Sequence, residues 1–136
     1  MSLSQTLTTS FKQQLLQGVH DFSTDTFYMA LYTASADLSA TTTVYTATGE
    51  VVGTGYTAGG AATTTSVSVT DTTAFVNFSN VVWTAALTAR GALIYNSSKS
   101  NKAVAILDFG ADKTSTTTFT VTMPANTSTT ALIRLP

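Results

Sequence analysis

Residues 26–33, Thr26-Phe27-Tyr28-Met29-Ala30-Leu31-Tyr32-Thr33, decide the fold. The stretch is rich in aromatic residues and is apolar at both odd and even positions. Successive side chains of a strand point to opposite faces, so both faces of this segment suit a buried environment. We therefore predict a strand at the centre of a sheet that is covered on both sides.

Further strand candidates follow along the chain, separated by turn residues. They are 50–52, 66–70, 74–78, 81–84, 89–95, 103–109, 116–123 and 130–135, whereas 34–48 is expected to be a loop. Short strands at this spacing are typical of sandwiches and related folds. The expected fold class is mainly β: a single β-sandwich or jelly-roll-like domain with one N-terminal amphipathic helix.

That helix is expected over residues 3–19. Large apolar residues recur there at steps of four, which is one face of a helix; they are Leu3, Leu7, Phe11, Leu15 and Val19. Ser2 or Ser10 fits the start, because each has a glutamine three residues later as in a capping box. Gly18 is the natural stop. We divide the chain into an N-terminal helical arm, 1–19, and a β-sandwich domain, 20–136.

The composition argues against several classes of partner. Only 10% of the residues are charged, the net charge is −1, and the six basic residues are mostly scattered, so no basic stripe for nucleic acid is expected. No stretch of about 18 apolar residues indicates a membrane span, and the N-terminus does not look like a signal peptide. The chain has 30 threonines, which suits strands whose outer faces carry hydroxyl groups.

The residues that usually carry chemistry are nearly absent. With one histidine and no cysteine, no zinc or iron ligand set is available, and we expect neither a metal nor a cofactor. His20 follows the expected helix and suits a polar or capping role there. The glycine-rich segment 53–60 lacks the lysine of a phosphate loop, and its Tyr56 suits an anchoring role. Trp83 is expected in the core. The sequence therefore predicts no enzyme.

Four segments carry a resemblance to a known group of proteins. They are Phe27–Thr33 (FYMALYT), Tyr45–Gly60 (YTATGEVVGTGYTAGG), Thr72–Trp83 (TTAFVNFSNVVW) and Ala89–Thr114 (ARGALIYNSSKSNKAVAILDFGADKT). In this order the sequence resembles small structural virion proteins of tailed bacteriophages over most of residues 20–135. GTGYTAGG and ARGALIYN are the most specific parts, and neither is a catalytic signature.

The resemblance implies a virion component that is assembled in the cytoplasm of the host bacterium. Within that class we expect a head decoration (cement) protein, whose partners are the major capsid protein or other virion proteins and further copies of itself, with a trimer favoured. Our hypothesis assigns the contacts to the N-terminal arm and the glycine-rich loop: Leu3, Leu7, Phe11, Leu15, Gly53, Gly55, Tyr56, Gly59 and Gly60. Deletion of residues 1–19 is then expected to abolish attachment and to leave the β-domain folded.

Two alternatives remain at this stage. One is a tail or neck component, such as an adaptor or a fibre-associated module. The other is a glycan-binding module for host attachment, which would use Tyr45, Tyr56 and Trp83 as exposed stacking platforms.

Overall fold

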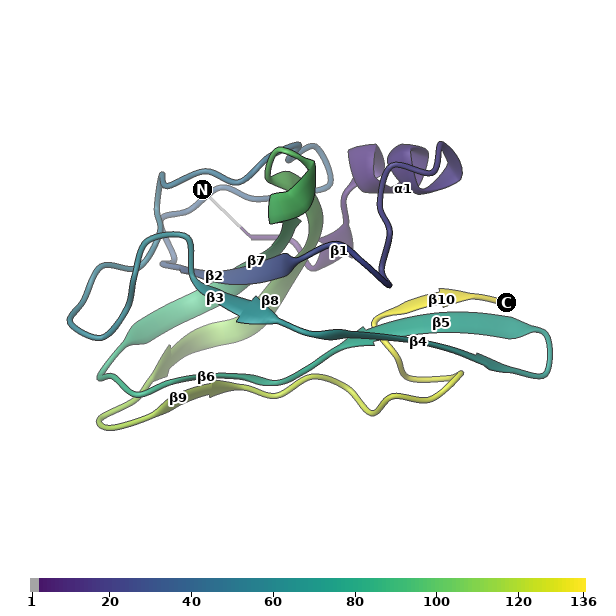
Figure 1. Ribbon diagram of the computed structural model, residues 1–136. Coiled ribbons are helices and arrows are strands. Elements are labelled where there is room, and N and C mark those ends of the chain that lie inside the picture. The colour runs from purple at the N-terminus through teal and green to yellow at the C-terminus, as the bar shows by residue number, and fades with distance from the viewer. Residues whose placement is uncertain (1–2) are drawn as a thin grey trace.

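The protein is mainly β with one short α-helix. The computed structural model describes residues 3–136 (Figure 1). Its elements in chain order are β1 (Thr6–Leu7), α1 (Thr9–Leu16), β2 (Phe27–Tyr32), β3 (Ala61–Thr63), β4 (Thr65–Thr70), β5 (Thr73–Phe78), β6 (Val81–Trp83), β7 (Thr88–Asn96), the 3-10 helix η1 (Ser97–Lys99), β8 (Lys102–Thr114), β9 (Phe119–Val121) and β10 (Ile133–Leu135). The predicted class, a β-sandwich-like domain with one helix, is confirmed.

Three antiparallel sheets form the domain. The largest has the order β1-β8-β7-β2-β3, and the smaller ones have the orders β10-β5-β4 and β6-β9. Apolar side chains from all three sheets meet in one core cluster, so the two smaller sheets serve as the second layer. Figure 1 shows the β10-β5-β4 sheet extending sideways from this body, with the tip of the β4–β5 hairpin at its far end.

Strand β2 is an internal strand of the largest sheet, although β7 is the middle one. It pairs with β7 on one side and with β3 on the other. Phe27, Met29 and Leu31 point into the core shared with the smaller sheets, whereas Ala30 and Tyr32 belong to a second cluster on the opposite face. That second face is covered by the long loop between β2 and β3, to which Ala36 and Leu38 contribute buried side chains. The prediction of a strand buried on both faces is therefore confirmed.

The helix is shorter than the predicted span of 3–19, and its start was predicted wrongly. It begins after Thr8, whose hydroxyl accepts a hydrogen bond from Phe11 N–H at 3.2 Å. The preceding residues form β1 instead, because pairing with β8 satisfies their backbone groups and keeps the apolar residues buried. Gly18 ends the helix as expected: with φ +73° it lets Val19 N–H donate to Gln14 O at 3.0 Å in a Schellman motif.

Candidate interaction surface

The structure packs the predicted N-terminal arm against its own domain. Leu3 is 9% exposed and Phe11 is fully buried. Phe11 lies in the main core, with its ring centroid 5.0 Å from that of His20 and 5.9 Å from that of Phe22. Leu7 sits in β1, the edge strand paired to β8. The apolar side of residues 3–11 is thus occupied within the chain, which makes it unavailable to a partner.

The glycine-rich loop also packs closely on its own chain. A side chain at Gly60 would place a Cβ atom 1.9 Å from Met29 O, and one at Gly55 would lie 2.7 Å from Ala85 Cβ. Both glycines have positive φ, +82° and +89°, which L-residues rarely adopt. Gly53 and Gly59 leave only slightly more room beside Leu87 and Tyr95. The glycines therefore allow the loop to lie tightly against its own strands.

Tyr56, the expected anchor on a partner, is anchored inside the protein. It is 9% exposed, and its hydroxyl donates to Glu50 Oε2 at 2.5 Å and accepts from Leu31 N–H at 2.9 Å. Glu50, 8% exposed, also accepts from the Tyr45 hydroxyl at 2.5 Å and from Gly59 N–H at 2.8 Å. Three neutral donors thus satisfy a buried carboxylate and tie the loop to β2.

This carboxylate affects the tyrosines around it. Burial, followed by the hydrogen bond to Glu50, raises the pKa of Tyr45 and Tyr56 far above the usual value. Burial and the charge of Glu50 raise the pKa of Tyr95 to about 12. The hydroxyl of Tyr95 donates to Gly59 O at 2.6 Å. All three tyrosines therefore stay protonated at neutral pH and act as hydrogen-bond donors that hold the loop.

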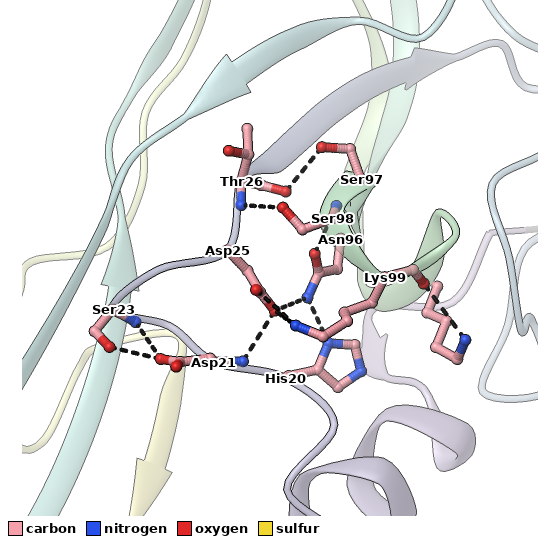
Figure 2. Close-up of polar contacts among 10 residues, drawn as sticks. His20, Asp21, Ser23, Asp25, Thr26, Asn96, Ser97, Ser98 and Lys99 are labelled. Carbon is pink, nitrogen blue, oxygen red and sulfur yellow. Dashed lines mark hydrogen bonds and ion pairs between the residues drawn. The ribbon is translucent and has the colours of Figure 1, made fainter.

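A second polar cluster joins the segment after α1 to the end of β7 (Figure 2). Asn96 Nδ2 lies 3.0 Å from His20 Nδ1 and donates to Asp25 Oδ2 at 2.8 Å. His20 Nε2 is 2.9 Å from Gln14 Oε1. Burial lowers the pKa of His20, although Asp25 opposes this shift. A neutral ring that accepts at Nδ1 and donates at Nε2 fits both neighbours. Both ring nitrogens of His20 are thus hydrogen-bonded, one to Gln14 of α1 and the other to Asn96 of β7.

Asp25 is the acceptor at the centre of this cluster. Its side chain is 6% exposed and receives Lys99 Nζ at 2.7 Å, together with Asp21 N–H at 3.0 Å. Burial alone raises the pKa of Asp25, but the hydrogen bonds from Asn96, Lys99 and Asp21 outweigh burial and lower it to about 2. Both carboxylate oxygens of Asp25 thus accept hydrogen bonds from the chain itself, and these bonds connect the segment after α1 to the end of β7.

Within residues 3–136 the structure holds no group of three or more histidine and carboxylate side chains placed to bind a metal ion. In the same range, no helix is both long and apolar enough to cross a membrane. No buried side-chain nitrogen or oxygen of these residues lacks a hydrogen-bond partner. The buried polar side-chain atoms of both clusters are thus paired within the chain.

The surface exposes several large apolar side chains. Those that are about half exposed or more are Leu16, Val44, Val52, Val67, Val69, Val82 and Leu135. Leu16 and Val52 are 90% and 96% exposed, respectively. Val67, Val69 and Leu135 share one face of the β10-β5-β4 sheet, because register pairs Val67 with Val76 and Val76 with Ile133. Isolated exposed apolar residues are ordinary, but a group on one sheet face is a candidate contact surface.

That face borders an open, mostly apolar groove of about 500 Å³. One wall is the end of α1 with the loop that follows it, and the other is the β10-β5-β4 sheet. Its lining residues are Leu15, Gly18, His20, Asp21, Phe22, Ser23, Val67, Ala74, Phe75, Val76, Ile133 and Leu135. Of the residues predicted to make contacts, Leu15 alone lines it. The alternation Ser66-Val67-Ser68-Val69-Thr70 was visible in the sequence, but the topology was needed to show that no layer covers these valines.

Comparison with models of protein families, with curated proteins and with solved structures found no match for this chain.

Proposed function

We propose that this chain is a structural subunit of a tailed-bacteriophage particle, and specifically a head decoration protein that bridges neighbouring capsomers. Its partners would be the major capsid protein, or other virion proteins, and further copies of itself, with a trimer as the favoured assembly. The chain would act after assembly in the host cytoplasm, as a part of the finished virion. The proposal rests first on the sequence resemblance described above.

The structural observation that carries the proposal is the combination of a satisfied interior with a weakly charged exterior from which several large aliphatic side chains protrude. Leu16 and Val52 are almost fully exposed. Leu16 is the last residue of α1, in the predicted arm, and Val52 directly precedes the glycine-rich loop. Few charges surround them, since only 10% of the residues are charged. Low charge and protruding aliphatic side chains suit a subunit held among neighbours, where these side chains become buried.

The contacts must therefore use other side chains than those first predicted. Leu3, Phe11 and Tyr56 are buried within the chain, so Leu16 takes the place of the first two and Val52 that of the third. The same burial removes support from glycan binding. A stacking platform needs an exposed ring, whereas Tyr56 and Trp83 are 9% and 6% exposed. Tyr45, the third residue of that hypothesis, is partly exposed, and its hydroxyl is bonded to Glu50.

The test is to locate the chain on the particle. Immunogold electron microscopy with antibody against the purified chain is expected to label the whole head. Labelling confined to the neck or tail would overturn the decoration assignment and favour the tail alternative. Labelling of no part of the particle would overturn the virion role itself.

A second arm of the test addresses the contact residues. Particles freed of the protein are incubated with the purified wild type, Leu16→Lys or Val52→Lys, and occupancy is measured by gel densitometry. Both changes lie at exposed positions and are expected to leave folding intact. We expect each to lower occupancy, because a charge is placed where an aliphatic side chain becomes buried. Full occupancy by both variants would remove these two residues from the interface.

A further inference from the structure

Strand β4 forms an open edge of the β10-β5-β4 sheet. Among residues 3–136 its strand partner is β5 alone, and the register over Thr65–Thr70 runs without a bulge to Thr73–Phe78. The hairpin closes at Asp71, whose φ of +54° suits a tight turn. The six residues of β4 therefore leave one whole side of the strand without a neighbouring strand.

The free backbone groups of this edge can be assigned. Ser79 N–H donates to Thr64 O at 2.8 Å. The even-numbered residues of β4 therefore direct their backbone N–H and C=O groups toward β5. Hydrogen-bonded pairs alternate along an antiparallel ladder. Thr65, Val67 and Val69 therefore direct their N–H and C=O groups away from β5. The hydroxyl of Thr65 is already bonded to Phe22 O at 2.5 Å, so the open stretch is centred on Val67 and Val69.

This edge lacks the usual protection against strand pairing. Exposed edges are commonly guarded by charges, prolines or bulges. The opposite edge strand, β10, carries exposed Arg134 and is followed by Pro136, and the free outer side of β8 carries Asp108, Asp112 and Lys113. Strand β4 and the preceding β3 contain neither a charged residue nor a proline. Among the residues described, β4 is the longest edge strand that contains neither a charged residue nor a proline.

The side chains of the open stretch are also unpartnered. Val67 is 56% and Val69 is 68% exposed, on the sheet face that borders the apolar groove. Their opposite face is covered, as shown by Asn77 Nδ2, which donates to Pro124 O at 2.6 Å. One face is thus covered by the chain's own C-terminal segment. The other face contributes Val76 and Ile133 to the main core but leaves Val67 and Val69 exposed toward the β4 edge.

We infer that a second copy of this chain pairs antiparallel along β4, so that two sheets join into one continuous sheet across a two-fold axis at Ser68. Val67 of one copy lies opposite Val69 of the other, and the reverse pair forms by symmetry. Each of these pairs exchanges two backbone hydrogen bonds and brings two exposed valines together on one face. This inference does not depend on the proposed virion role, and the two-fold contact along β4 is distinct from the trimer proposed for the virion.

Charge favours this occupant. The pairing stretch itself is uncharged, so no like charges face each other within it. The charged residue closest to it along the chain, Asp71, lies in the hairpin turn. Antiparallel pairing puts the two Asp71 carboxylates at opposite ends of the contact, separated by six residue steps or about 20 Å. At that distance repulsion between exposed charges is largely screened at physiological ionic strength.

The contact area indicates a weak dimer. A strand contact of four to six residues, about 3.4 Å each on a sheet about 10 Å thick, covers on the order of 150–200 Å². Stable complexes bury about 800 Å² on each partner. Contacts of Leu135 and the groove walls add to the strand contact, but the total remains small. We therefore expect an association that is weaker than that of a stable complex of standard interface size.

The first measurement is sedimentation equilibrium of the purified chain up to about 1 mM. The mean mass is expected to rise from 14.2 kDa toward twice that value. Val67→Lys and Val69→Lys are expected to keep the chain monomeric, whereas Val82→Lys, which adds the same charge at another exposed strand valine, is expected to dimerise like the wild type. A wild-type chain that stays monomeric, or a dimer insensitive to both β4 variants, would overturn the inference.

The second measurement tests the register. Ser68→Cys gives a chain with a single thiol, because the natural sequence contains no cysteine. At the two-fold axis the two Cα atoms form a non-hydrogen-bonded pair about 4.5 Å apart, within the range of a disulfide. Mild oxidation is expected to link most of the Ser68→Cys chains as dimers, with Val82→Cys linking far less. Equal linking of the two variants would contradict the proposed pairing even if the lysine variants failed to fold.

Discussion

Replacement of Phe11 by alanine gives the sharpest test of how the N-terminal segment is used. Phe11 is fully buried in the main core and packs against the rings of His20 and Phe22. Truncation of such a side chain removes its transfer free energy and leaves a cavity, at a cost of about 3–5 kcal/mol. The midpoint of thermal unfolding falls by about 3–5 °C per kcal/mol for a domain of this size, so a drop of roughly 10–20 °C is expected.

The assay is urea unfolding, with the free energy of unfolding obtained by linear extrapolation. Leu16→Ala is the matched control, because Leu16 lies on the same helix and is 90% exposed. Its expected change is within about 0.5 kcal/mol. A Phe11→Ala chain that loses less than about 1 kcal/mol would refute the reasoning. It would show that α1 contributes little to its own domain and is free to act as an arm on a neighbour.

Three further predictions concern other parts of the molecule. The pKa of Asp25 is lowered from 3.8 to about 2 in the folded protein, so its contribution is complete above about pH 4 and is lost as the pH falls through 2. At about 1.4 kcal/mol per pKa unit this contribution is at most about 2.5 kcal/mol, and Asp25→Asn is expected to flatten the pH dependence of the free energy of unfolding in that window. Tyr56→Phe leaves Glu50 one donor short and is expected to cost about 1–3 kcal/mol in urea unfolding; a change near zero would argue against the buried hydrogen bond. Gly60→Ala places a Cβ atom 1.9 Å from a backbone oxygen, whereas Gly18→Ala meets nothing within 4 Å, although both have positive φ. Thermal unfolding is expected to show a loss of about 1 kcal/mol for Gly18→Ala and a clearly larger one for Gly60→Ala, and equal losses would contradict the close approach.

The burial of the N-terminal segment also changes the result that we expect from deletion of residues 1–19, which the sequence alone predicted to leave the β-domain folded. Leu3 and Phe11 are buried and β1 extends the largest sheet, so their removal exposes core residues of that sheet. We now expect the shortened chain to unfold or aggregate instead of persisting as an isolated β-domain. Circular dichroism of the purified fragment is the measurement, and a cooperative transition at the wild-type temperature would show that the segment is dispensable for folding.

Strand positions followed from the sequence because alternation and turn residues are local signals. Predicted strands at 26–33, 66–70 and 74–78 correspond to β2, β4 and β5 within one residue at each end. The helix start was missed for a physical reason. Apolar residues at steps of four also fit a strand followed by a helix, and pairing of β1 with β8 is a long-range contact that no local pattern reveals. Residues 50–52 form only an isolated bridge, from Glu50 to Tyr32.

The candidate surface was harder to predict than the fold. An exposed tyrosine beside glycines looks identical in sequence to one buried against a carboxylate, and only the approach of Glu50 to Tyr56 decides between them. Likewise, the alternating valines of β4 are compatible in sequence with either a covered or an exposed strand face. Which face is covered depends on where the C-terminal segment returns to the sheet, and that is a property of the topology.

Sparse charge also sets how the protein responds to ionic strength. Residues 3–136 contain two ion pairs, Asp25 with Lys99 and Arg90 with Asp108, and the remaining polar contacts involve mostly hydroxyls, amides and backbone groups. Salt screens interactions between exposed charges and leaves such neutral contacts almost unchanged. Folding and self-association should therefore vary little between dilute buffer and physiological ionic strength. The same property removes long-range electrostatic steering, so partners meet this protein at the slower rates of unguided diffusion.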